Sequence, residues 1–292
     1  MAKIARDQLD SFLHDGDQAI WSTAALVVAL QAVASETHQA AALAVLSASG
    51  LDGVTGLGDR DGLASQAAAP IHQVGALLRG EGHMWTTQSD EALLAQGRAS
   101  AQGAAGFAQF GLPMLTGLQE AFATGARMLD VGTGVAAMAV AYAELFPGLT
   151  VVGIDVMPRV LAMAERTVAE SSVSDRIILR EQDVSSLDDP ETYVLAWLPA
   201  PFIPEAALGP GVLRVVDALQ PGGWLMLGHG KYGGSVMNDA IGRFKTVTYG
   251  GTALSDEQAE EMLRSAGLLE VRTVPTPEGA PAITVGRKPT RA

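Results

Sequence analysis

The segment that most constrains this chain lies near its middle and reads Arg-Met-Leu-Asp-Val-Gly-Thr-Gly-Val-Ala-Ala over residues 127–137. Its apolar start predicts a buried strand at 128–131, and a helix is predicted to follow over 136–145. Gly132 and Gly134 predict a tight turn between them, because glycine allows sharp backbone angles and lets a ligand approach main-chain N–H groups. The segment therefore predicts a strand–turn–helix unit that can hold a ligand.

A second predicted strand, residues 151–154, ends in Asp155, 23 residues after Gly132. A carboxylate at the tip of the second strand of a βαβ unit is placed to accept hydrogen bonds from both hydroxyls of a ribose. The two strands together predict a ligand that contains a nucleoside. A doubly wound domain whose turns bind nothing is the alternative.

A dinucleotide would fit the same layout, but its usual motif is Gly-x-Gly-x-x-Gly, whose third glycine lets helix and strand pack closely. This chain has Ala137 at that third position and an acid, Asp130, shortly before Gly132. A nicotinamide-dependent oxidoreductase is therefore disfavoured and stays open only as an alternative.

With its acid ahead of the glycines, the segment resembles the first motif of class I S-adenosylmethionine-dependent methyltransferases, acid-x-Gly-x-Gly-x-Gly, and departs from it only at Ala136. The resemblance implies S-adenosyl-L-methionine as the cofactor. It places Asp130, Gly132 and Gly134 around the methionine part of that cofactor and Asp155 on its ribose.

Three further segments follow in the order of that family. Residues 176–184 predict a strand that ends in Asp183, which the resemblance places at the adenine amino group. Residues 193–198 predict an apolar strand whose C-terminal end faces the methyl group, and residues 219–228 carry the Pro-Gly-Gly turn that is frequent in the family. The cofactor-binding residues implied are Asp130, Gly132, Gly134, Asp155, Val156, Asp183, Val184 and Trp197.

The end of the chain resembles the same family. Residues 252–271 are similar to its late helix, Ala-Gly turn and following strand, and residues 268–273 and 282–287 predict a final strand pair. The resemblance covers residues 127–288. It implies an α/β fold, a doubly wound Rossmann-like sheet of seven strands with the last one antiparallel, preceded by a mostly helical N-terminal domain.

Composition limits the partners of the chain. Of its 292 residues 48% are hydrophobic, yet it has no uncharged apolar run of the length, about 18 residues, that spans a membrane. It starts without a signal-like apolar stretch and has no cysteine, so a cytoplasmic protein is predicted. The net charge of −13 argues against a nucleic-acid partner, which usually requires a basic surface. The sequence has no acidic cluster at a strand end that resembles a site for a divalent cation, so no metal is expected.

The first part of the chain has a different character. Residues 24–34 and 39–46 are rich in alanine and leucine, and they predict helices that are apolar nearly all round and therefore buried. A loop rich in glycine and aspartate is predicted at 50–62. Further helices are predicted at 63–68, 70–78, 91–104 and 113–123.

This order resembles the winged-helix dimerisation domain that precedes the catalytic domain in bacterial and plant small-molecule O-methyltransferases, with residues 84–87 in the wing. The resemblance implies a homodimer whose N-terminal helices close the active site; a larger monomeric lid domain is the alternative. DNA binding is disfavoured, because only Arg60 and Arg79 are basic between residues 40 and 97. The predicted domains are 1–110, a helical, winged-helix-like dimerisation or lid domain; 111–124, a linker helix; and 125–292, the catalytic domain.

The methyl acceptor is expected beside residues 198–204, which follow the strand at the methyl group. This segment has no ionisable side chain before Glu205, so it predicts an apolar wall in which Pro199 and Phe202 contact the substrate. Many methyltransferases of this shape have a histidine there that removes a proton from the acceptor hydroxyl. This chain has no histidine in that segment.

The nearest replacement base is His229, after the Pro-Gly-Gly turn. Loops at that edge of a doubly wound sheet face the ligand crevice, and imidazole transfers protons near neutral pH. A surface histidine, or one that only hydrogen-bonds the substrate, is the alternative. Lys231 is predicted to orient an acidic acceptor, and a solvated surface lysine is the alternative. Residues 245–251, with Tyr249, are predicted to line the same pocket.

These features predict an enzyme that transfers a methyl group from S-adenosyl-L-methionine to a small, largely apolar or aromatic metabolite at an oxygen atom. A small-molecule N- or C-methyltransferase and a non-catalytic regulatory protein that binds the cofactor are the alternatives.

Overall fold

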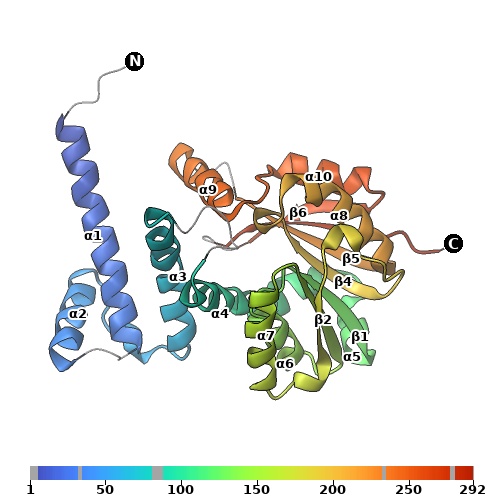
Figure 1. The fold of residues 1–292 in the computed structure, drawn as a ribbon, viewed down its shortest axis with the longest axis horizontal. Helices are drawn as coiled ribbons and strands as arrows, with labels where there is room; N and C mark the ends of the chain where they lie inside the picture. The colour runs from blue at the N-terminus through green and yellow to red at the C-terminus, as the bar shows by residue number, and fades with distance from the viewer. Residues whose placement is uncertain (1–5, 32–34, 81–87, 232–234, 277–279, 292) are drawn as a thin grey trace.

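The computed structural model describes residues 6–31, 35–80, 88–231, 235–276 and 280–291. A helical N-terminal part lies at one end of the molecule and an α/β part at the other (Figure 1). Within the described ranges, no helix is long and apolar enough to cross a membrane.

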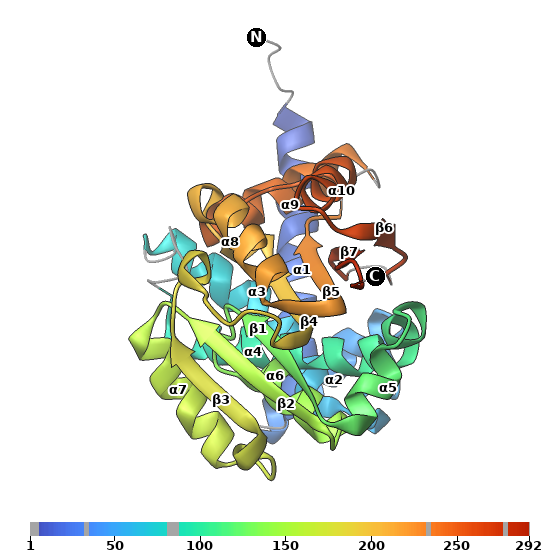
Figure 2. The same cartoon turned by 90° about the vertical axis from the view of Figure 1, so that its right-hand side faces the viewer.

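The α/β part is built on one seven-stranded sheet with the order β3-β2-β1-β4-β5-β7-β6 (Figure 2). Neighbouring strands are parallel except for β7, which runs antiparallel to β5 and β6. This confirms the predicted doubly wound sheet, including the parallel pairing of 128–131 with 151–154. The strands are β1 Ala126–Val131, β2 Leu149–Asp155, β3 Ile177–Glu181, β4 Tyr193–Pro199, β5 Leu219–His229, β6 Leu269–Val274 and β7 Ala282–Arg287.

Helices cover both faces of the sheet. Burial on both faces explains why the sequence of β1 is apolar at successive positions. Met128 packs into a cluster with residues of α5, α6 and α7, whereas Leu129 and Val131 pack into a cluster with residues of α8 and α10. A strand buried on both faces has a near-continuous apolar sequence instead of an alternating one. The helices of this part are α5 Leu118–Thr124, α6 Ala137–Leu145, α7 Pro158–Ala169, α8 Glu205–Ala218, α9 Val236–Tyr249 and α10 Asp256–Ser265.

The N-terminal part consists of α1 Arg6–Gln31, α2 Glu36–Ala48, α3 Arg60–Leu78 and α4 Asp90–Gly106. The predicted break between 63–68 and 70–78 is wrong, because α3 continues through Pro70. Proline fixes φ at a value that a helix accepts, and the hydrogen bond it removes is offset here by the close packing of buried alanines. The described residues before β1 form no strand, and the predicted wing at 84–87 lies outside the described residues.

The single linker helix predicted at 113–123 is also wrong. A short 3₁₀ turn at Leu112–Met114 is followed by the extended residue Leu115, and α5 begins only at Leu118. Gly117 has φ +82°, a left-handed conformation that interrupts a helix and suits glycine.

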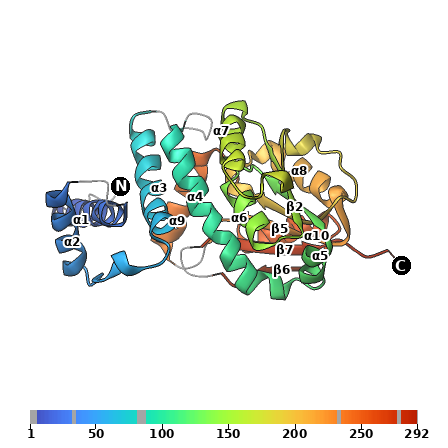
Figure 3. The same cartoon turned by 90° about the horizontal axis from the view of Figure 1, so that it is seen from below.

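The predicted burial of the N-terminal helices is confirmed for only some of their apolar residues. Ala29 and Leu30 near the end of α1 are buried, whereas Phe12, Ile20 and Trp21 are exposed, Trp21 by 67%. Helix α1 lies at the end of the molecule opposite the sheet (Figures 1 and 3). This part of the chain therefore presents an apolar surface.

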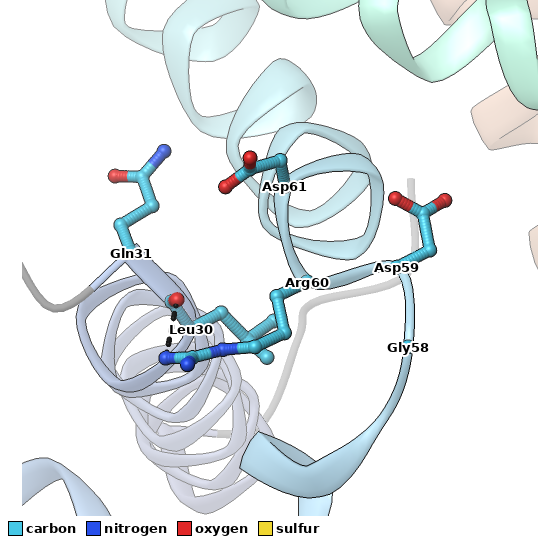
Figure 4. Close-up of a pocket in the computed structure, with 6 residues that line it drawn as sticks. All are labelled: Leu30, Gln31, Gly58, Asp59, Arg60 and Asp61. Atoms are coloured by element: carbon cyan, nitrogen blue, oxygen red, sulfur yellow. Dashed lines mark hydrogen bonds between the residues drawn. The ribbon is translucent and has the colours of Figure 1, made fainter.

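Arg60 joins α1 to α3 (Figure 4). Its guanidinium donates hydrogen bonds to the carbonyl oxygens of Leu30 at 2.8 Å and Ala29 at 3.3 Å, at the C-terminal end of α1, where a positive charge is favourable. A cavity of about 410 Å³ lies beside this contact. None of its lining residues belongs to the sheet, so the cavity is separate from the site described below.

Candidate functional site

The glycine turn follows β1 and contains three left-handed residues. Gly132, Gly134 and Ala136 have φ of +65°, +59° and +59°. Helix α6 begins at Ala137, so the prediction that it begins at Ala136 is wrong by one residue. Ala136 holds a conformation that costs a residue with a Cβ about 1–2 kcal/mol. A Cβ on Gly134 would meet nothing nearer than 3.9 Å, so a ligand can approach the backbone at this turn.

Asp130 lies at the base of the turn and is only 1% exposed. Its Oδ2 accepts a hydrogen bond from the Thr133 hydroxyl at 2.8 Å, whereas its Oδ1 is buried without a hydrogen-bond partner. Burial raises the pKa of Asp130 to about 7 despite the bond from Thr133. An unpaired buried carboxylate oxygen is costly, and a ligand ammonium group would satisfy it.

Asp155, the last residue of β2, connects the turn to the neighbouring strand. Its Oδ2 accepts from the backbone N–H of Gly134 and its Oδ1 from that of Met157, both at 3.0 Å. Burial raises the pKa of Asp155, and these N–H groups act in the opposite direction. The backbone N–H of Val156 acts on the same carboxylate. A carboxylate has about four acceptor positions, so acceptor capacity remains for a ligand hydroxyl.

Asp183, which is predicted at the adenine, and the other predicted cofactor residues Val156 and Val184 have different environments. Val156 is exposed directly after β2. Asp183 is exposed, and its Oδ1 accepts from the backbone N–H and the hydroxyl of Ser185, each at 2.7 Å. Val184 is buried, and its side chain packs on α8 where a Cβ on Gly211 would lie 2.8 Å from it. The Val184 side chain is therefore used for packing, whereas Val156 and Asp183 are accessible.

The end of β4 approaches the turn from the other side. Pro199 Cγ lies 3.9 Å from the position of a Cβ on Gly132. Trp197 is partly buried, and its ring covers Gly228 of β5 so closely that a Cβ there would overlap it. Phe202 stacks on Tyr249 with 5.0 Å between ring centroids. The fold thus brings Pro199 next to the glycine turn and extends the apolar wall from there.

The environment of His229 differs from the one predicted. His229 is the last residue of β5 and is 0% exposed, so it does not lie in an exposed loop. Its Nδ1 donates to the Gly230 carbonyl at 3.0 Å, so Nε2 is left to accept from the Thr284 hydroxyl at 2.8 Å. Burial lowers the pKa of His229, and the nearby Asp256 acts in the opposite direction. Since both ring nitrogens are engaged inside the protein, this arrangement favours a structural role over the predicted role as a general base.

Lys231 also lies differently from the prediction. It is exposed and donates to the Thr276 carbonyl at 3.0 Å, which directs its ammonium group to the chain segment after β6. Its predicted contact with an acidic acceptor would require this bond to be exchanged.

Two parts of the site were not predicted from the sequence. Thr133 is one, although a hydroxyl between two glycines next to an acid is a usable signal. The other is α4, which packs so closely on the turn that a Cβ on Gly97 would overlap Val135. Nothing in the sequence of α4 indicates this contact. Among the described residues, no three His, Asp or Glu side chains gather in a group that could hold a metal ion.

Comparison with known proteins places this site in a recognised domain. Residues 128–223 match the family described as "Methyltransferase domain". A carboxy-S-adenosyl-L-methionine synthase from Chromohalobacter salexigens is 30% identical over 106 residues, which are 35% of this chain and 39% of that protein. The match therefore spans well under half of the length of this curated relative.

Two solved structures are similar over the whole chain. An O-methyltransferase family protein from Burkholderia thailandensis has a TM-score of 0.66 at 16% identity, covering 100% of both chains. Human N-acetylserotonin methyltransferase in complex with SAM also has a TM-score of 0.66 at 16% identity, covering 99% of this chain and 100% of the human one. At this identity the likeness shows a shared fold, and that fold includes the helical N-terminal part.

Proposed function

We propose that this chain transfers a methyl group from S-adenosyl-L-methionine to a small organic molecule. The match of residues 128–223 to the family described as "Methyltransferase domain" supports this proposal. The observation that carries the proposal is the pair of carboxylates at the glycine turn. Asp130 has a buried, unpaired oxygen, and Asp155 has acceptor capacity beyond its backbone hydrogen bonds.

The residues present fit the cofactor. The unpaired Asp130 Oδ1 would accept from the ammonium of its methionine part, and Asp155 would accept from the ribose hydroxyls. Gly132 and Gly134 would let the methionine part lie against the backbone, and Val156, Asp183 and the backbone of Val184 would lie at the adenine. Trp197, whose ring covers Gly228 of β5, would contact the cofactor from the other side of β1. When bound, the cofactor supplies an electrophilic methyl group on a sulfonium.

The protein's own contribution is alignment and exclusion of water, which account for much of the rate in a displacement of this kind. Pro199 and Phe202 supply an apolar wall without an ionisable group, and His229 is engaged in packing. The substrate that suits such a site is a small, apolar or aromatic molecule methylated at an oxygen that ionises readily, such as an acidic phenol, because it needs no strong base. Nitrogen or carbon acceptors are the second candidates.

A screen with methyl-labelled cofactor tests the proposed reaction. We expect label to enter small phenols or hydroxy acids, and we expect His229→Gln to retain turnover because alignment and not proton removal is what the site supplies. Amines and oxo acids test the nitrogen and carbon alternatives. Loss of turnover in His229→Gln with normal cofactor binding would restore the base role, and no labelled product from any class would support a non-catalytic, cofactor-binding protein.

We also propose a homodimer formed through the N-terminal helices. The exposed apolar residues of α1, which include Phe12 and Trp21, form a surface that is unfavourable in a monomer. Light scattering at micromolar concentration is expected to give the mass of two chains. The mass of one chain would contradict the dimer and leave a monomeric lid domain.

A further inference from the structure

A chain of side-chain contacts connects the N-terminal helices with the segment after β4. The Tyr249 hydroxyl donates to Gln73 Oε1 at 2.7 Å, and Gln73 Nε2 donates to Gln96 Oε1 at 2.8 Å. At the other end, the Tyr249 ring packs on Phe202 with an interplanar angle of 31°. Residues of α3, α4 and α9 are thereby joined, and α9 lies next to α3 (Figure 3).

Both ends of this chain of contacts lie beside the glycine turn. Gln96 precedes Gly97, where α4 packs closely on Val135 in the turn. Phe202 ends the 3₁₀ turn that begins directly after Pro199, the β4 residue nearest to Gly132. The Tyr249–Gln73 bond therefore bridges the two walls on either side of the turn.

The bond is not needed to hold α9 against the α/β part. Directly after α9, Gly251 lies so close to the backbone of Pro201 that a Cβ would overlap it. The next residue, Thr252, donates its backbone N–H to the Ala200 carbonyl at 2.8 Å and its hydroxyl to the Ile203 carbonyl at 2.9 Å. The end of α9 is therefore fixed by these contacts in addition to the Tyr249–Gln73 bond.

The chemistry of the pair suits an exchangeable polar contact. Gln73 is only 6% exposed, and its amide can make four hydrogen bonds, of which the bonds to Tyr249 and Gln96 use two. Burial raises the pKa of Tyr249 to about 12, so its phenol stays protonated and can donate at neutral pH. Beside these groups, the Phe202 and Tyr249 rings offer flat apolar faces.

We propose that Tyr249 and Gln73 form the polar end of the methyl-acceptor site, where they exchange their mutual hydrogen bond for bonds to a polar substituent of a planar aromatic acceptor that packs on Phe202. The proposal rests on the proposed methyl-transfer function and defines the substrate class as an aromatic molecule with a hydrogen-bonding group. It assigns specificity to two residues 176 positions apart in sequence.

Calorimetry on the protein saturated with S-adenosylhomocysteine tests this, using 1-naphthol and 1-methylnaphthalene as probes. We expect the wild type to bind 1-naphthol more tightly than the methyl compound, which has no hydrogen-bonding group. Tyr249→Phe keeps the ring and removes the hydroxyl, so it should weaken 1-naphthol binding by about tenfold, as for one buried hydrogen bond, and leave binding of the methyl compound unchanged. Tyr193→Phe is the matched control, because it also removes a hydroxyl, bonded to Asp189, but at the opposite end of β4. It should change neither affinity.

The outcomes separate this inference from the function on which it rests. If S-adenosylhomocysteine fails to bind, the proposed function is wrong. If it binds and 1-naphthol does not, or if Tyr249→Phe lowers the melting temperature while the ratio of the two probe affinities stays constant, the proposed acceptor contact is wrong and Tyr249 is only a structural link.

Discussion

Replacement of Asp130 by asparagine is expected to weaken binding of S-adenosylhomocysteine by about 3–5 kcal/mol, or roughly 10²- to 10⁴-fold, because it leaves the ligand's ammonium buried without its counter-charge. The same change should stabilise the protein without ligand. Asn keeps an acceptor for the Thr133 hydroxyl but removes a buried charge whose Oδ1 has no partner.

The change in stability caused by Asp130→Asn should depend on pH. The pKa of Asp130 is raised to about 7 in the folded chain, above its ordinary unfolded value near 4. The folded state therefore holds the proton more tightly, so this stabilising effect is complete below pH 4 and is lost as the pH rises through 7. The gain in stability from Asp130→Asn should thus be small at pH 4 and reach up to about 4 kcal/mol at pH 8.

The affinity of the wild type for the ligand should change with pH in the opposite direction to its stability. Only ionised Asp130 pairs with an ammonium group, so affinity of the wild type should fall about tenfold from pH 8 to pH 6, while Asp130→Asn shows no such slope. Thermal unfolding without ligand and calorimetry with S-adenosylhomocysteine at both pH values measure the two effects. Unchanged affinity in the variant would remove Asp130 from the site.

Replacement of Asp155 by alanine is expected to weaken the same ligand by about 2–3 kcal/mol, since a carboxylate that accepts two ribose hydroxyls is lost. The variant should also be less stable than the wild type, because the backbone N–H groups of Gly134 and Met157 lose their acceptor. Asp175→Ala, at an exposed position in the turn before β3, is the control and should alter neither property. An Asp155→Ala variant that unfolds earlier but binds normally would limit Asp155 to bracing the turn.

The strand–turn–helix part of the fold was predictable because its signals are local. Two apolar strands, two glycines and an acid at each strand end determine the turn within 30 residues of sequence, and the structure places them as adjacent parallel strands. The antiparallel final strand pair was likewise predicted, through the resemblance of the chain's end to a known family.

The details that failed depend on contacts distant in sequence. His229 was predicted from its place after a strand, but its environment is set by Thr284, 55 residues later, which engages the ring. The Tyr249–Gln73 bond joins residues of two different parts of the chain, and no local pattern indicates such a pair. The continuation of α3 through Pro70 depends on the alanines that it buries against neighbouring helices.

Calorimetry of the wild-type chain at pH 8 with S-adenosylhomocysteine and, separately, with NAD tests the central claim most directly. Both ligands offer a ribose to Asp155, but only the first brings an ammonium to the unpaired oxygen of Asp130. We predict saturable, one-to-one binding of S-adenosylhomocysteine and no measurable binding of NAD. Tight binding of NAD without binding of S-adenosylhomocysteine would contradict the assignment of this glycine turn to S-adenosyl-L-methionine.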